Sequence, residues 1–304
     1  MFQIICKIGP LNIPTYGAIV AIIVAIASII LIIIACLGGM RRRAISVVLF
    51  WTLTLAIVAM IPLIISVTIY SYGLMLAVAV VVSTLLLARD AHRSNINADI
   101  IFDLVFWAVI SGIVGARMFY IALNYPFFLK HPSEIIMVQN GGLAWQGGLI
   151  LGSIVVMLYI KSKRLPLSTM LDVLVPYLAL GQSIGRVGCF LNGCCYGRTF
   201  DGGMYFPVHD ATLHPTQLYL SVGFFIVFII LRKYQRFSEI PGLVFASYLI
   251  LASSLRFGVE FFRADHEIIF LGLSIFQFVC FGILLFAFCF VYATLIKHSN
   301  TEAM

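Results

Sequence analysis

Long apolar runs separated by short polar connections dominate this sequence. Nine runs are long enough to cross a bilayer, because a transmembrane helix needs about 20 mostly apolar residues. The predicted spans cover approximately Tyr16–Leu37, Ala44–Tyr70, Gly73–Ala88, Ile100–Leu123, Leu143–Ile160, Met170–Leu191, Thr216–Leu231, Gly242–Phe262 and Ile268–Ile296. The pattern predicts an all-α, polytopic helical membrane protein.

The composition agrees with this class and excludes a soluble globular domain. Of 304 residues, 62% are hydrophobic and only 10% are charged. The seven cysteines lie mostly within apolar runs, where free thiols behave as small hydrophobic side chains. They lack the paired spacing of zinc sites, and the adjacent Cys194 and Cys195 are expected to be poorly placed to share one ion. A disulfide between one of these two residues and another cysteine is an alternative that the sequence leaves undecided.

The basic residues predict the orientation of the nine spans. Twelve of the nineteen Lys and Arg residues fall on one side of the predicted membrane, four on the other and three within spans. Cytoplasmic loops carry the excess of positive charge, so the N-terminus is expected outside and the C-terminus in the cytoplasm. The start of the chain lacks a basic signal-peptide n-region and a cleavage site, so the first span is expected to be retained. The residues from about 192 to 215 are expected to form a small external cap.

Several polar side chains are predicted at the outer level of different spans. Charges inside a membrane are costly and usually mark a functional site. Three of them stand at i, i+4 and i+7 and therefore share one helix face. The residues at this level are Tyr72, Arg117, Gln146, Arg186, Arg256, Glu260 and Arg263.

This excess of arginine favours a phosphate ligand. A guanidinium group presents paired planar donors that match phosphate oxygens. The alternative for each single residue is a helix ion pair between Arg256 and Glu260, or an arginine whose charged end reaches the membrane surface. One glutamate cannot neutralise four arginines, so a bound anionic lipid is the expected partner of the whole set.

Six ordered motifs resemble bacterial prolipoprotein diacylglyceryl transferases. They are YSYGLML (70–76), GARMFY (115–120), GGLAWQGGL (141–149), GQSIGRVGCFLNGCCYGR (181–198), HPTQLY (214–219) and LRFGVEFFR (255–263). The resemblance covers seven of the nine predicted spans. It implies a seven-helix transferase domain at 70–304 and an extension of two helices at 1–69.

The resemblance also implies a reaction and its site. The family transfers the diacylglyceryl group of phosphatidylglycerol to the lipobox cysteine thiol of a preprolipoprotein, forms a thioether and releases glycerol phosphate, without metal or cofactor. The expected location is the bacterial inner membrane, with the site towards its outer, periplasmic face. Arg186 and Arg256 are expected to hold the phosphate. The other expected site residues are Tyr72, Arg117, Gln146, Gly147, Gly148, Gly188, Asn192, His214, Glu260 and Arg263.

One departure from the family pattern concerns proton transfer. Well-known members carry a histidine, proposed to accept the thiol proton, where this chain has Gln146. A glutamine amide cannot act as a base at neutral pH. Glu260, His214, His209 or a water polarised by arginine are the possible substitutes. The alternative function is an inactive or altered paralogue that binds anionic phospholipid at the outer leaflet.

Overall fold

The computed structural model describes residues 4–8, 67–91, 96–137, 141–264, 268–270 and 272–302. These residues belong to two compact units, Met1–Leu74 and Met75–Met304. The predicted span Tyr16–Leu37 and most of the predicted span Ala44–Tyr70 lie outside the described residues.

The first unit contains a two-stranded antiparallel sheet. Strand β1 (Ile4–Ile8) pairs with β2 (Val67–Tyr70), and Ile4 is the partner of Tyr70. The predicted helix Ala44–Tyr70 is therefore wrong over its last four residues, which are extended. Val67, Thr68 and Ile69 are β-branched, and residues of this type are enriched in strands.

Seven helices in the described part of the chain are long and apolar enough to span a membrane. Each corresponds to one predicted apolar run, and six of them match it within a few residues. The helices are α3 (Ser71–Ala91), α4 (Ala98–Leu123), α6 (Trp145–Ser162), α7 (Leu167–Asn192), α8 (Thr216–Tyr234), α9 (Leu243–Glu260) and α10 (Ile275–Glu302).

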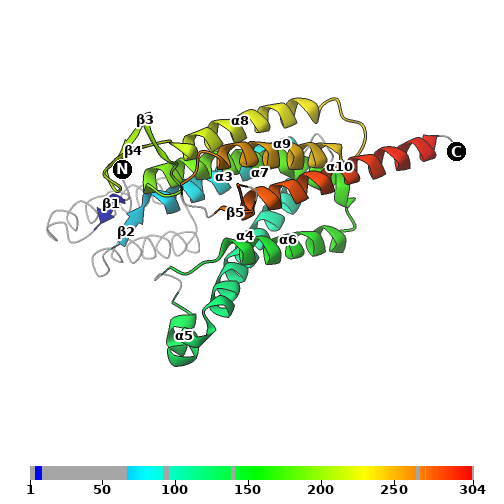
Figure 1. The fold of residues 1–304 in the computed structure, drawn as a ribbon. Helices are drawn as coiled ribbons and strands as arrows, with labels where there is room; N and C mark the ends of the chain where they lie inside the picture. The colour runs from blue at the N-terminus through cyan, green and yellow to red at the C-terminus, as the bar shows by residue number, and fades with distance from the viewer. Residues whose placement is uncertain are drawn as a thin grey trace, which may run out of the picture. The chain divides into compact units, whose positions relative to one another are not determined.

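The long helices of the second unit pack mainly against their neighbours in the sequence. Helix α7 contacts α8 and α9, α9 contacts α10, and α4 contacts α6 (Figure 1). Glycines allow α4 and α6 to approach closely: a Cβ atom at Gly147 would overlap the carbonyl oxygen of Gly115, and one at Gly148 would stand 2.9 Å from that of Gly112. Small residues at such crossings maximise van der Waals contact between membrane helices.

The connections on one side of the bundle are folded. The segment between α4 and α6 contains α5 (Tyr125–Lys130) and a 3₁₀ helix, Pro132–Ile135. The segment between α7 and α8 contains an antiparallel hairpin of β3 (Thr199–Phe206) and β4 (Ala211–Leu213), which lies within the residues predicted to form the cap.

The last predicted span began too early. Residues Ile268–Phe270 (β5) and Leu273–Ser274 (β6) pair as strands before α10 starts at Ile275. Gly272 lies between them at φ +74°, a left-handed conformation that glycine adopts without steric cost. Apolar composition alone could not separate this hairpin from the helix that follows.

Candidate active site

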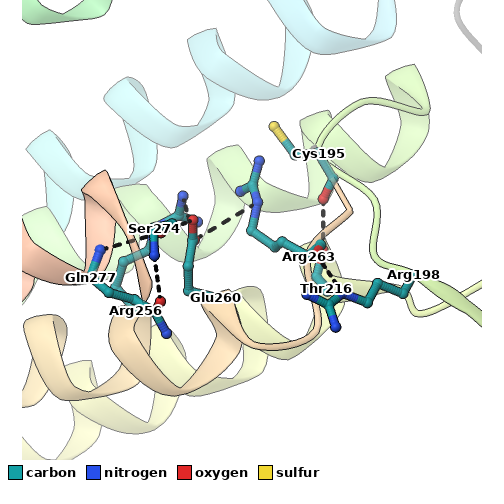
Figure 2. Close-up of polar contacts among 8 residues, drawn as sticks. All are labelled: Cys195, Arg198, Thr216, Arg256, Glu260, Arg263, Ser274 and Gln277. Atoms are coloured by element: carbon teal, nitrogen blue, oxygen red, sulfur yellow. Dashed lines mark hydrogen bonds and ion pairs between the residues drawn. The ribbon is translucent and has the colours of Figure 1, made fainter. Parts of the chain in front are cut away.

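Glu260 is the centre of a buried ionic cluster at the end of α9 (Figure 2). Its side chain is nearly inaccessible and forms an ion pair with Arg256 at 3.2 Å, one helical turn earlier. The Nε atom of Arg263 lies 3.9 Å from the same carboxylate oxygen. The other oxygen accepts a hydrogen bond of 3.1 Å from the Ser274 hydroxyl. Arg256 and Glu260 share one face of α9 as predicted, whereas Arg263 lies three residues beyond the helix end and still reaches the same carboxylate.

Arg256 has hydrogen-bonding capacity beyond its ion pair. Its Nη1 atom is buried and has no hydrogen-bond partner among the described residues, while Nη2 faces Glu260. The guanidinium carbon lies 5.7 Å from the ring centre of Phe276. Because an unpaired buried donor on a cation is costly, this geometry favours an acceptor that is supplied by a ligand.

Arg186 adds a further positive charge to the cluster. It lies on α7, is half-buried, and makes no hydrogen bond or ion pair within the described part of the chain. Arg186 and Arg263 lie close enough to Arg256 for their charges to repel it. Three guanidinium charges therefore lie close together, with the carboxylate of Glu260 paired to two of them, and an anion would relieve their repulsion.

The hairpin is attached to this cluster through the backbone next to Arg263. Arg198 donates its backbone N–H to Phe262 at 2.8 Å and its Nε to the Arg263 carbonyl at 3.2 Å. Gly197 forms an isolated antiparallel bridge with Arg263. His214 lies at the same junction, with its ring 4.2 Å from that of Phe200 and its Nδ1 3.2 Å from the Tyr219 hydroxyl. His214 therefore lies where the residues of the predicted cap, 192–215, meet α8.

A tight turn after α7 brings three thiols together. Thr216 donates to the Cys195 carbonyl at 2.7 Å and Gln217 to the Cys194 carbonyl at 2.6 Å. Cys195 is held at φ +62°, a conformation that is uncommon for a residue other than glycine. The sulfur atoms of Cys189, Cys194 and Cys195 all lie within 4.8 Å of one another, and all three thiols are free.

The prediction that the adjacent Cys194 and Cys195 are poorly placed to share an ion is therefore wrong, because their sulfur atoms lie close together. The left-handed backbone at Cys195 turns the chain, so the two neighbouring side chains converge instead of diverging. The pKa of the Cys195 thiol is lowered, because Cys189 and Cys194 donate to its sulfur and because the charges of Arg263 and Arg186 favour the thiolate.

Arg117 orders a loop. Only 8% of the residue is exposed, and its guanidinium contacts five backbone carbonyl groups, one for each N–H donor that the group has. These carbonyls belong to Glu134, Ile135, Met137, Gly141 and Gly142. The side chain therefore fixes the segment between α5 and α6.

The remaining expected residues lie at different places. Gln146 is exposed in the first turn of α6, and within the described residues no hydrogen bond or ion pair joins it to the Glu260 cluster. Gly147 and Gly148 lie in the contact between α4 and α6, so their observed part is in packing. Gly188 is buried on α7, and Asn192 is the half-buried last residue of the same helix. Tyr72 is exposed in the first turn of α3.

Sequence reasoning missed several polar residues that hold the site. The Ser274 hydroxyl donates a hydrogen bond to the Glu260 carboxylate. The side-chain oxygen of Gln277 accepts a hydrogen bond of 2.9 Å from the Ser274 backbone N–H. Thr216 and Gln217 are fully buried although both are polar. The motif HPTQLY could have indicated Thr216 and Gln217, because two polar residues at the start of an apolar run need hydrogen-bond partners in the protein. No comparable motif surrounds Ser274.

Fold and site together define a multi-pass helical membrane protein with a buried, arginine-rich site that suits a phosphate-bearing ligand. A family described as prolipoprotein diacylglyceryl transferase matches residues 59–293. The chain belongs to this family, whose members are multi-pass membrane enzymes.

Individual relatives agree with the family match. A phosphatidylglycerol–prolipoprotein diacylglyceryl transferase of Clostridium tetani is 37% identical over 204 residues, which are 65% of this chain and 82% of the relative. Those of Finegoldia magna and Streptococcus pyogenes are 35% identical over 195 residues and 34% identical over 233 residues. The alignment with the Finegoldia magna protein covers 64% of this chain and 79% of that relative. The alignment with the Streptococcus pyogenes protein covers 73% of this chain and 90% of that relative.

Proposed function

We propose that this chain transfers the diacylglyceryl group of phosphatidylglycerol to the lipobox cysteine thiol of a preprolipoprotein. A thioether forms and glycerol phosphate leaves. Family membership supports the reaction, and the surplus of guanidinium charge around Glu260 is the observation in this chain that carries the proposal.

The departing phosphate explains the need for this charge. Negative charge accumulates on the leaving oxygen as the carbon–oxygen bond breaks, and preorganised donors stabilise it most effectively in a site that excludes water. Arg186 and the buried Nη1 of Arg256 are the groups proposed to meet the phosphate. Glu260 keeps Arg256 and Arg263 in position. Arg117 orders the segment between α5 and α6.

Six further residues are proposed to contribute to substrate binding. Tyr72, at the first turn of α3, is proposed to line the lipid site. The others are proposed through the motifs they belong to, and they are Gly147, Gly148, Gly188, Asn192 and His214.

The proposed location is the bacterial inner membrane, with the Glu260 cluster towards the outer face. The excess of basic residues at the opposite helix ends supports this orientation, since cytoplasmic loops retain positive charge. The N-terminus would lie outside and the C-terminus in the cytoplasm. The lipid would enter sideways from the bilayer, and the lipobox peptide from the side of the β3–β4 hairpin.

The direct test uses the purified full-length chain, phosphatidylglycerol and a lipobox peptide. Mass spectrometry should detect a peptide enlarged by a diacylglyceryl group, and a peptide with serine in place of the lipobox cysteine should stay unmodified. A family member of known activity serves as the positive control. If that control forms thioether and this chain forms none, the proposed function is wrong.

The second candidate is a paralogue that binds anionic phospholipid without turnover. The observation that favours it is Gln146, an exposed amide at the position where a proton-accepting histidine was expected. Complementation of a bacterial strain depleted of its own transferase separates the two. Growth supports the enzyme, whereas bound anionic lipid without growth supports the paralogue.

A further inference from the structure

We propose that Cys189, Cys194 and Cys195 bind one zinc-class cation, whose fourth coordination position receives the acceptor thiolate of the lipobox cysteine. This inference rests on the proposed transferase function and adds to it a metal site, in contrast to the metal-free reaction that the resemblance to the family implies.

The positions of the three sulfurs fit such an ion. Zinc–sulfur bonds are about 2.3 Å long, so the ligands of a tetrahedral site stand about 3.8 Å apart. The three sulfurs already lie within 4.8 Å of one another, so at most about 1 Å of closure is needed. Three protein ligands with one open position is the arrangement of catalytic zinc, while a structural site has four protein ligands.

The fold fixes two of these cysteines through their backbone. Thr216 and Gln217 are fully buried and bond the carbonyls of Cys195 and Cys194, which holds the turn in place. Cys189 lies five residues earlier, within the last two turns of α7. Partners of this kind orient ligands and are a normal part of a metal site. Cys194 and Cys195 are partly exposed, so an acceptor thiol can reach the cluster.

The charges around the cluster are also appropriate. Three thiolates and one divalent cation carry a net charge of −1, and an added acceptor thiolate makes it −2. Arg186 and Arg263 lie close enough to Cys195 for their charges to act on it. The same arginines belong to the cluster around Glu260, so the metal site and the proposed phosphate site are neighbours.

The chemical step is balanced without an oxidant or a reductant. The acceptor thiol loses its proton to water as its sulfur binds the cation, and this sulfur attacks the glyceryl carbon that carries the phosphate ester. The carbon–sulfur bond forms, the carbon–oxygen bond breaks, and its electron pair leaves on the glycerol phosphate. The thioether product is neutral and binds the cation more weakly than a thiolate, so it is released. A cation in this place would promote deprotonation of the acceptor thiol, which the amide of Gln146 cannot do as a base.

The test measures metal content and activity separately in the full-length protein, purified under reducing conditions. Elemental analysis should find one zinc per chain, and Co²⁺ added to the stripped protein should produce the absorption of a tetrahedral thiolate complex. Replacing Cys189, Cys194 or Cys195 by serine should abolish both signals. Cys289→Ser is the matched control, because Cys289 is an exposed thiol on α10 away from the cluster.

Activity gives the second readout. Removing the ion with a chelator should lower the rate at least about 100-fold, the low end of what proton transfer contributes, and added Zn²⁺ should restore it. Wild-type protein without bound metal, unchanged Co²⁺ absorption in the cysteine variants, or loss of absorption in Cys289→Ser would each overturn the site. Full activity of the stripped enzyme would overturn its catalytic part while leaving the transferase intact. A metal-loaded protein without thioether product would instead count against the proposed function.

Discussion

At the scale of single residues, the arginines of this chain divide into two kinds. Arg117 has every donor bound to a backbone carbonyl, whereas Arg186 has no hydrogen bond or ion pair within the described residues. The first kind is a structural element and the second is available to a ligand. The sequence placed both at the same membrane depth and could not separate them, because the difference depends on a loop that folds back over α4.

Replacing Arg186 by alanine should remove catalysis without unfolding the protein. Loss of one preorganised donor to a developing anion typically costs about 10²–10³-fold in rate. The measurement is the rate of thioether formation, with thermal stability recorded on the same sample. Arg186→Lys keeps the charge and should retain part of the rate. Wild-type activity in Arg186→Ala would remove this residue from the mechanism.

Arg117→Lys should lower the stability of the protein, in contrast to Arg186→Ala, which should lower its activity. Lysine has three donors for five carbonyl groups, so at least two carbonyls lose a charged partner, at about 1.5–3 kcal/mol each. The segment between α5 and α6 should become sensitive to limited proteolysis, and the thermal midpoint should fall. Arg236→Lys is the matched control, because Arg236 is exposed after α8. Equal protease resistance in the two variants would contradict the role given to Arg117.

Gln146→His tests where the acceptor thiol loses its proton. The side chain of Gln146 is exposed, and among the described residues it has no hydrogen bond or ion pair with the Glu260 cluster. A histidine there should therefore raise the rate of thioether formation by less than about tenfold, far below the usual contribution of a general base. A gain of 10² or more would show that the native chain lacks a base at this position, and would count against thiol activation at the cysteine cluster.

At the scale of elements, hydrophobic patterning predicted the seven helices that the structure describes as candidate spans. It failed at Val67–Tyr70 and at Ile268–Phe270, where apolar residues form strands. Short apolar runs carry no period long enough to tell a strand from a helix end. The cysteine cluster was missed for a related reason: a single left-handed residue, Cys195, determines it, and sequence spacing does not report a dihedral angle.

The α4–α6 contact can be tested through its glycines. In Gly147→Ala the new methyl group would overlap the Gly115 carbonyl oxygen and the Phe119 side chain, so the helices must separate. Overpacking of this kind typically costs about 1–3 kcal/mol, visible as a lower thermal midpoint in detergent. Gly282→Ala is the matched control, since a Cβ atom there meets no atom within 4 Å. Equal midpoints in both variants would show that the contact is looser than described.

At the scale of the whole molecule, the two units differ in how they relate to the family. The family match covers residues 59–293 and therefore leaves out most of the first unit. Within that unit β1 pairs with β2, which brings the two ends of the segment 4–70 together immediately before α3. A segment with paired ends can be removed without leaving a gap in the chain that follows. This is the physical argument for treating residues 1–69 as an extension of the transferase domain.

The extension is therefore expected to be dispensable for both topology and chemistry. Its two predicted spans are an even number, so a chain of residues 70–304 should keep its N-terminus outside and its C-terminus in the cytoplasm. A fluorescent reporter that matures only in the cytoplasm, fused after residue 304, should give the same signal with and without the extension. The shortened chain should also form thioether in the reconstituted assay. A lost reporter signal would mean that the extension contributes an odd number of spans. Loss of activity with the signal retained would mean that residues 1–69 are needed for the chemistry, and would contradict their treatment as a dispensable extension.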